Sequence, residues 1–179
     1  MSYSEERCLE FASIGAHQAA MALAKMCGSA PREEPPRCWW VEVSGLMESV
    51  EDIQDGGAVI FVDLTGAVTG QAGLLLSRAV VDEILLRLVG SDPLAAIDER
   101  GRSALSETGN IALSAVASAL GELQAGIVMP TVPRLCLDVS QLLERGQLRP
   151  PSSTARVYVA ETTLEDHRLK LRLLLIPIG

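Results

Sequence analysis

The spacing of apolar residues changes several times along this chain, and each change predicts a different kind of element. Residues 4–26 place apolar side chains at helical intervals, which predicts an amphipathic helix that ends at the Gly/Pro/Glu-rich stretch 28–37. Three runs of apolar and β-branched residues follow, and they predict strands at 38–46, 58–64 and 71–77. The glycine-containing segment between the last two runs predicts that they form a hairpin.

The second half of the chain repeats this order after a linker helix, which is predicted at about 77–90. A strong helix start lies at 91–93 (Ser-Asp-Pro), and an alanine-rich helical pattern continues to about Leu123, with Gly101 as the place where a break would fall. The remaining patterns predict strands at 134–140, 155–163 and 168–178, a short helix at 141–145 and a loop at 149–153.

A shift of 97 positions aligns the two halves without a gap. It places several residues of the first half on identical residues of the second: Glu10 on Glu107, Ile14 on Ile111, Pro36 on Pro133 and Arg37 on Arg134. The shared order and register predict an internal duplication. We therefore expect one domain over residues 1–179, built from repeats at about 4–77 and 95–178.

Composition and charge exclude several classes of function. Apolar residues make up 48% of the 179 residues, enough for a sizeable core. The formal net charge of -8 argues against nucleic-acid binding, because phosphate contacts need clustered Lys and Arg. No apolar stretch approaches the length of a membrane span, and the acidic N-terminus lacks the order of a signal peptide, so we expect a cytoplasmic protein.

Metal ligands are also sparse in the sequence. The four cysteines are scattered without a CxxC pair, and His17 and His167 stand alone. Structural zinc sites need closer ligand pairs than these. We expect the chain itself to bind neither a metal nor another cofactor.

One face of the second long helix carries short polar side chains. At about 100° per residue, this stripe consists of Ser103, Glu107, Asn110, Ser114, Ser118 and Gly121. Solvated faces usually favour Lys, Glu, Arg and Gln, whereas Ser and Asn compete for backbone hydrogen bonds inside a helix. The stripe is therefore either a solvated face or a shallow surface that another protein can approach closely, and its residues leave both readings open. The same face of the first helix holds Glu6, Glu10, Ser13 and His17.

Ser103, Glu107, Asn110 and Pro133 resemble the signature of the CheC/CheX/FliY family of chemotaxis phosphatases. That signature is Ser or Asp, three residues, Glu, two residues, Asn, and a Pro after about 22 residues, and 22 residues separate Asn110 from Pro133 here. Residues 10–28 also resemble the first helix of the family. The resemblance implies an α/β (α+β) domain of pseudo-two-fold symmetry, with two long helices packed on a mostly antiparallel sheet.

The resemblance also implies an activity, the hydrolysis of the aspartyl phosphate of a CheY-type response regulator in two-component signalling. Glu107 would pair with the active-site lysine of the receiver domain, and Asn110 would position the attacking water. The receiver would supply the Mg²⁺. Ser103 and Pro133 would support the motif at the edge of the contact.

Ser13 departs from the family pattern, because members with two sites carry Asn in both helices. Glu10 and Pro36 persist, so we expect a degenerate first site that is weak or inactive. The alternative function is a non-catalytic module that sequesters a receiver or binds a CheD-type deamidase.

The adjacent Trp39 and Trp40 must point to opposite faces if they lie on a strand. One of them would then be core. The other is either covered by a helix or an exposed anchor for a partner or a homodimer.

Overall fold

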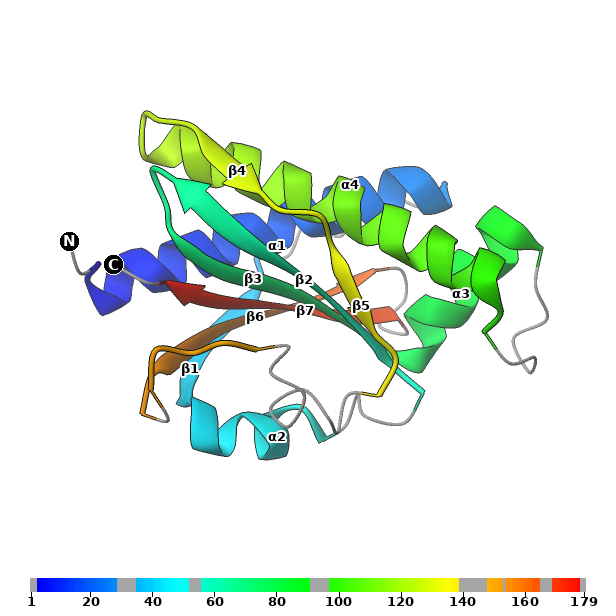
Figure 1. The fold of residues 1–179 in the computed structure, drawn as a ribbon, viewed down its shortest axis with the longest axis horizontal. Coiled ribbons are helices and arrows are strands. Elements are labelled where there is room, and N and C mark those ends of the chain that lie inside the picture. The colour runs from blue at the N-terminus through cyan, green and yellow to red at the C-terminus, as the bar shows by residue number, and fades with distance from the viewer. Residues whose placement is uncertain are drawn as a thin grey trace.

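The computed structural model describes residues 3–28, 35–51, 56–90, 97–138, 148–152, 154–164 and 169–177. Within these ranges, seven strands form one antiparallel sheet in the order β1-β6-β7-β3-β2-β4, and β5 also pairs with β2 (Figure 1). The strands are β1 (Arg37–Glu42), β2 (Ala58–Gly66), β3 (Gly70–Leu76), β4 (Val128–Pro130), β5 (Arg134–Cys136), β6 (Arg156–Leu164) and β7 (Leu169–Pro177).

Two long helices cover one face of this sheet. α1 (Glu5–Cys27) and α4 (Glu99–Leu123) lie side by side on it, and α3 (Arg78–Val89) packs against α4 at one end (Figure 1). The short α2 (Leu46–Ser49) lies on the opposite face, directly after the 3-10 helix η1 (Val43–Gly45). The predicted fold class, two long helices on a mostly antiparallel sheet, is therefore confirmed.

Side chains alternate between the two faces of the sheet along each strand. Each face carries its own cluster of buried residues. On β2, Ile60 and Val62 belong to the larger core beneath α1 and α4, whereas Val59 and Phe61 belong to a smaller core that includes Leu46 of α2. The larger core is rich in alanine from the two helices. Small side chains let the helices approach the sheet closely.

The strand order of the sheet is symmetric, in that each strand of the first half has a counterpart from the second half at the same distance from the centre. β3 and β7 pair at the centre, β2 and β6 flank them, and β1 and β4 occupy the edges. Arg37 and Arg134, which the shift of 97 positions aligns, each begin a strand. This order is the one that a duplication produces, and the duplication itself stays a prediction.

The ends of the long helices follow from their capping residues. Ser4 caps α1 by accepting a hydrogen bond from Arg7 N (3.2 Å), and Gly28 ends the helix with a left-handed φ of 64°. Asp98 caps α4 by accepting a hydrogen bond from Gly101 N (2.8 Å), so α4 begins at Glu99. The helix start predicted at 91–93 lies outside the described residues. α4 continues through Gly101 without a break.

Two strand predictions also need correction. The strand expected at 38–46 ends at Glu42, since Val43 and Leu46 turn into η1 and α2 to fill the smaller core. The strand expected at 134–140 ends at Cys136, and no pattern in the sequence predicted β4 before it. The helix expected at 141–145 lies outside the described residues. Among the helices that the structure describes, none is long and apolar enough to cross a membrane.

Candidate functional site

The face of α4 that carries Glu107 and Asn110 is turned to solvent. Both side chains are exposed, and their i,i+3 spacing places their Cβ atoms about 5–6 Å apart on one helix face. Between them, Gly109 is buried against Ile60 of β2, where an added Cβ would meet Ile60 Cδ1 at 2.8 Å. The missing side chain at position 109 therefore sets how closely this part of α4 lies on the sheet.

The stripe predicted on α4 is largely exposed, as expected. Ser103 and Ser118 are exposed and Ser114 is half-buried, in line with a polar outer face. Gly121 is the exception. It is buried against the turn after α4, where Gly126 N donates to Gly121 O (2.9 Å), so its assignment to the exposed stripe is wrong.

An open groove of about 590 Å³ lies between α4 and the segment that joins β4 to β5. Its lining includes all four residues of the predicted motif: Ser103, Glu107 and Asn110 from the helix and Pro133 from the opposite wall. The structure thus brings the motif together across the 22 residues that separate Asn110 from Pro133. Sequence reasoning missed the rest of the lining, which is Ser106, Pro130, Thr131 and Val132.

The second wall of the groove is a β-bulge. Leu64 of β2 pairs with Pro130 and Phe61 pairs with Arg134. The partner strand therefore holds one more residue than β2 over this interval, and residues 131–133 bulge out of the ladder. Bulges of this kind recur beside functional sites, where they redirect side chains. β4 and β5 are in effect one strand interrupted beside the groove.

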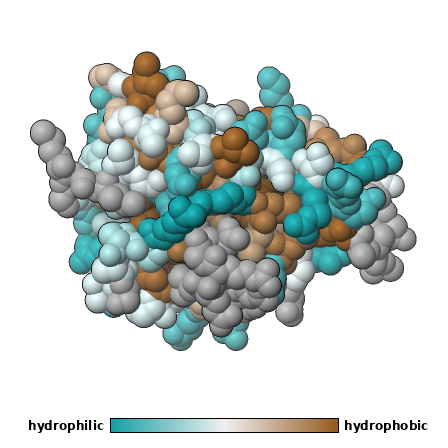
Figure 2. All heavy atoms as spheres, in the orientation of Figure 1, coloured by the Kyte–Doolittle hydropathy of each residue, from teal (hydrophilic) through white to brown (hydrophobic). Residues whose placement is uncertain are grey.

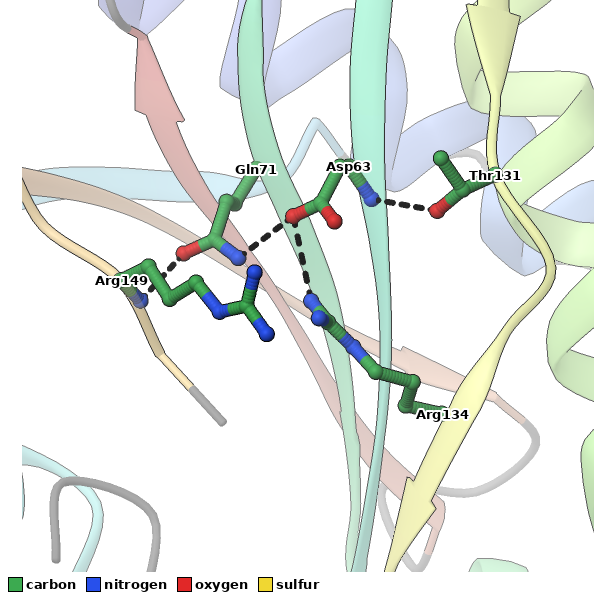
Figure 3. Close-up of polar contacts among 5 residues, drawn as sticks. All are labelled: Asp63, Gln71, Thr131, Arg134 and Arg149. Carbon is green, nitrogen blue, oxygen red and sulfur yellow. Dashed lines mark hydrogen bonds and ion pairs between the residues drawn. The ribbon is translucent and has the colours of Figure 1, made fainter. Parts of the chain in front are cut away.

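A polar network on β2 and β3 holds this bulge in place (Figure 3). Asp63 N donates to Thr131 Oγ1 (2.9 Å), and Thr131 N donates to Asp63 O (2.9 Å). The Asp63 carboxylate accepts from Gln71 Nε2 (2.7 Å) and pairs with Arg134 (3.1 Å). Arg149 N in turn donates to Gln71 Oε1 (2.5 Å). The groove wall is thus fixed at both ends, at Thr131 and at Arg134.

Among the residues that the structure describes, neither the Glu107 carboxylate nor the Asn110 amide has a hydrogen bond or ion pair within the chain. Both groups are therefore available to a binding partner. The described residues also contain no group of three or more His, Cys, Asp or Glu side chains that could hold a metal ion.

The equivalent face of α1 is arranged differently. Glu10 pairs with Arg7 at 2.5 Å, and Arg7 also donates to Leu123 O at the end of α4 (2.8 Å). The guanidinium of Arg7 lies 5.0 Å from the centre of the Phe11 ring. Arg7 therefore joins the start of α1 to the C-terminus of α4, where a cation is favoured by the helix dipole. The carboxylate of the first motif is thus exposed but paired with an arginine of the same helix.

Ser13, the altered position of the first motif, is half-buried. Burial raises the pKa of the Cys38 thiol, and a hydrogen bond with Ser13 partly opposes that rise. Cys38 Sγ also lies 3.6 Å from the carbonyl oxygen of Pro36. Ser13 of α1 thus interacts with β1 through Cys38.

The two tryptophans of β1 take opposite faces, as predicted. Trp39 packs against the smaller core, with the guanidinium of Arg172 5.7 Å from its ring centre. Trp40 is 36% exposed and lies under the guanidinium of Arg156 at 4.0 Å. An arginine, rather than a helix, therefore covers much of Trp40, and the homodimer stays a prediction.

The fold and the groove together indicate the class of protein that this chain resembles. Two long helices on an antiparallel sheet, with a Glu–Asn pair exposed on the second helix, match the expectation from the motif. The comparisons with known proteins confirm the resemblance to the CheC/CheX/FliY family. No family model matches the chain.

Among individual relatives, the CheY-P phosphatase CheC of Bacillus subtilis (strain 168) is 24% identical over 178 residues, which cover 94% of this chain and 85% of CheC. The crystal structure of Thermotoga maritima FliY superposes with a TM-score of 0.69 at 20% identity, covering 98% of this chain and 92% of that one. FliM from H. pylori, in complex with SpeE, superposes with a TM-score of 0.68 at 10% identity, covering 99% of this chain and 91% of FliM. CheX from Borrelia burgdorferi, in complex with CheY, BeF3 and Mg²⁺, superposes with a TM-score of 0.57 at 14% identity, covering 96% of this chain and 99% of CheX.

Proposed function

We propose that this protein accelerates hydrolysis of the aspartyl phosphate of a CheY-type response regulator. The observation that carries the proposal is the Glu107–Asn110 pair, exposed in one groove and unpartnered among the described residues. The CheY-P phosphatase activity in the name of the CheC relative supports it, as does the complex of CheX with CheY.

In the proposed reaction, Asn110 positions the attacking water. An aspartyl phosphate is an acyl phosphate, so the reaction needs a water molecule in line with the phosphorus. The water oxygen bonds to phosphorus, the bond from phosphorus to the receiver's carboxylate oxygen breaks, and inorganic phosphate and a proton leave. The Asn110 amide offers both a donor and an acceptor for that water. Positioning of this kind contributes several kcal/mol to phosphoryl transfer.

Glu107 serves as the anchor of the proposed complex. Its carboxylate would pair with the active-site lysine of the receiver and so set the orientation of α4. Glu107 is exposed before binding, so the pair would form by displacing water from both charges. Ser103 and Pro133 line the groove at the edges of this contact. In this proposal the receiver's own phosphorylation site holds the Mg²⁺, and this chain is not expected to contribute a ligand to it.

The test is the decay rate of a phosphorylated CheY-type receiver in Mg²⁺, with and without the protein. We expect wild type to accelerate decay, and Asn110→Ala to lose the acceleration while binding the receiver within a few-fold of wild type. Glu107→Lys is expected to weaken binding by reversing the charge. Ser13→Ala is the matched control, because it alters the equivalent position of α1, and we expect it to keep full activity.

Two results would refute the proposal. An Asn110→Ala variant with wild-type turnover would remove the water-positioning role. Absence of acceleration with several receivers that nevertheless bind would favour the non-catalytic module, and a CheD-type partner would then be the next to test.

A further inference from the structure

Val132 is the most exposed large apolar side chain in the part of the chain that the structure describes. It is 85% exposed and lines the groove opposite Glu107 and Asn110. A free apolar side chain at this exposure is unfavourable in water unless another surface covers it. Unlike an isolated valine on the surface, Val132 lies in the wall of the candidate site, where a bound partner would cover it.

The backbone around Val132 is unusually well fixed for an exposed segment. Thr131, directly before it, exchanges two hydrogen bonds with the backbone of Asp63, both of 2.9 Å. Arg134, two residues after it, pairs with the Asp63 carboxylate. Figure 3 shows both ends of the bulge attached to this one residue of β2. Since both ends are held, Val132 is presented in one place, and little conformational entropy is lost when a partner binds there.

The segment that contains Val132 is also free of charge. Residues 123–133 include no Asp, Glu, Lys or Arg, although charged residues make up 21% of the chain. In Figure 2, hydrophobic atoms are visible over β4 and where β4 meets β5. Edge strands are usually protected from other chains by charged side chains. The absence of such protection beside the groove is a feature of an interaction surface.

We propose that Val132 is an apolar anchor that the bulge presents to the receiver domain as Glu107 and Asn110 enter its active site. This inference rests on the proposed function and adds a second type of contact to it. The occupant is the receiver because Val132 and the Glu–Asn pair line the same groove, so that a partner reaching one wall also meets the other. The partner surface beside the phosphorylation site must then carry an apolar patch.

The test measures affinity for a CheY-type receiver loaded with beryllofluoride and Mg²⁺, which mimics the phosphorylated state and is not hydrolysed. We expect Val132→Glu to weaken binding at least tenfold, because a carboxylate would be buried against an apolar surface. The matched control is Ile127→Glu, which alters a side chain that is 74% exposed in the same uncharged segment but does not line the groove. We expect this control to bind within twofold of wild type.

Turnover separates this inference from the proposed function. With a phosphorylated receiver, Val132→Glu is expected to raise KM and to leave kcat unchanged. Wild-type affinity in Val132→Glu, or equal losses in both variants, would overturn the anchor while leaving the phosphatase intact. If Val132→Glu instead dissociates a homodimer without changing receiver affinity, the surface belongs to a second copy and the inference is wrong. A wild-type protein that binds no receiver would remove both proposals.

Discussion

Gly109 links the packing of α4 to the geometry of the candidate site, and Gly109→Ala tests that link. A Cβ at this position would lie 2.8 Å from Cδ1 and 2.9 Å from Cβ of Ile60, and nearer still to its Cγ2, where ordinary contacts begin at 3.4 Å. Ile60 is completely buried in β2, so it has no free space into which to move. The helix must therefore shift outward by about 1 Å to restore ordinary contact.

The expected effect on stability is the difference between two terms. Overpacking costs about 1–3 kcal/mol, whereas replacing a helical glycine by alanine gains about 1 kcal/mol. We expect a net loss of about 1–2 kcal/mol in the free energy of unfolding, measured with urea. A displacement of about 1 Å at a catalytic group costs up to about a hundredfold in rate. Receiver dephosphorylation should therefore fall far more than stability alone explains.

The control for this experiment is Gly45→Ala, since no atom lies within 4 Å of a Cβ at that position. Adding Ile60→Ala to Gly109→Ala removes the two contacting atoms beyond Cβ, so the two losses of stability should be less than additive. Strict additivity, or a Gly109→Ala protein with wild-type stability and activity, would refute the argument that this close approach positions α4.

Two further predictions concern stability. Arg7→Ala is expected to lower the free energy of unfolding by about 1–2 kcal/mol, because the pairing with Glu10 and the hydrogen bond to Leu123 O are lost together; a loss below about 0.5 kcal/mol in urea unfolding would contradict this role. Stability is also expected to fall above about pH 9, since burial raises the pKa of the Cys8 and Cys38 thiols above their ordinary 9.0 and the unfolded chain then releases protons that the folded chain retains. Cys8→Ala should flatten this alkaline slope, and an unchanged slope would exclude Cys8 as a cause.

The elements that the sequence predicted well are long and regular. α1 and the hairpins β2–β3 and β6–β7 agree with prediction to within a few residues, because each carries many apolar positions at one period. The motif face of α4 was predictable for the same reason. A face composed of Ser, Glu and Asn opposite a continuous apolar face leaves a single orientation on the sheet.

The second wall of the groove was not predictable in this way. β4 and β5 are three residues each, too short to show a period, and the bulge between them depends on Asp63, which lies far away in sequence. Pro130 and Pro133 were the residues from which the edge strand and its bulge could have been predicted. Proline has no backbone N–H to donate to a sheet, so within sheets it is found at edge strands and bulges. Asp98, which makes the capping hydrogen bond at the start of α4, was not singled out from the sequence, because the Ser-Asp-Pro sequence at 91–93 is the stronger local signal for a helix start.

The difference between the two halves of the chain explains why one motif is the better candidate site. The shift of 97 positions that aligns Glu10 with Glu107 aligns Arg7 with Ala104. Arg7 neutralises Glu10 and joins α1 to the end of α4, whereas an alanine methyl group offers Glu107 no charge to pair with. The aligned carboxylate is therefore paired within the chain in the first half, whereas Glu107 has no ion pair among the residues that the structure describes. The residue three positions before the Glu, Arg7 in one half and Ala104 in the other, thus distinguishes a contact that stabilises the helix pair from a carboxylate that could recognise another protein.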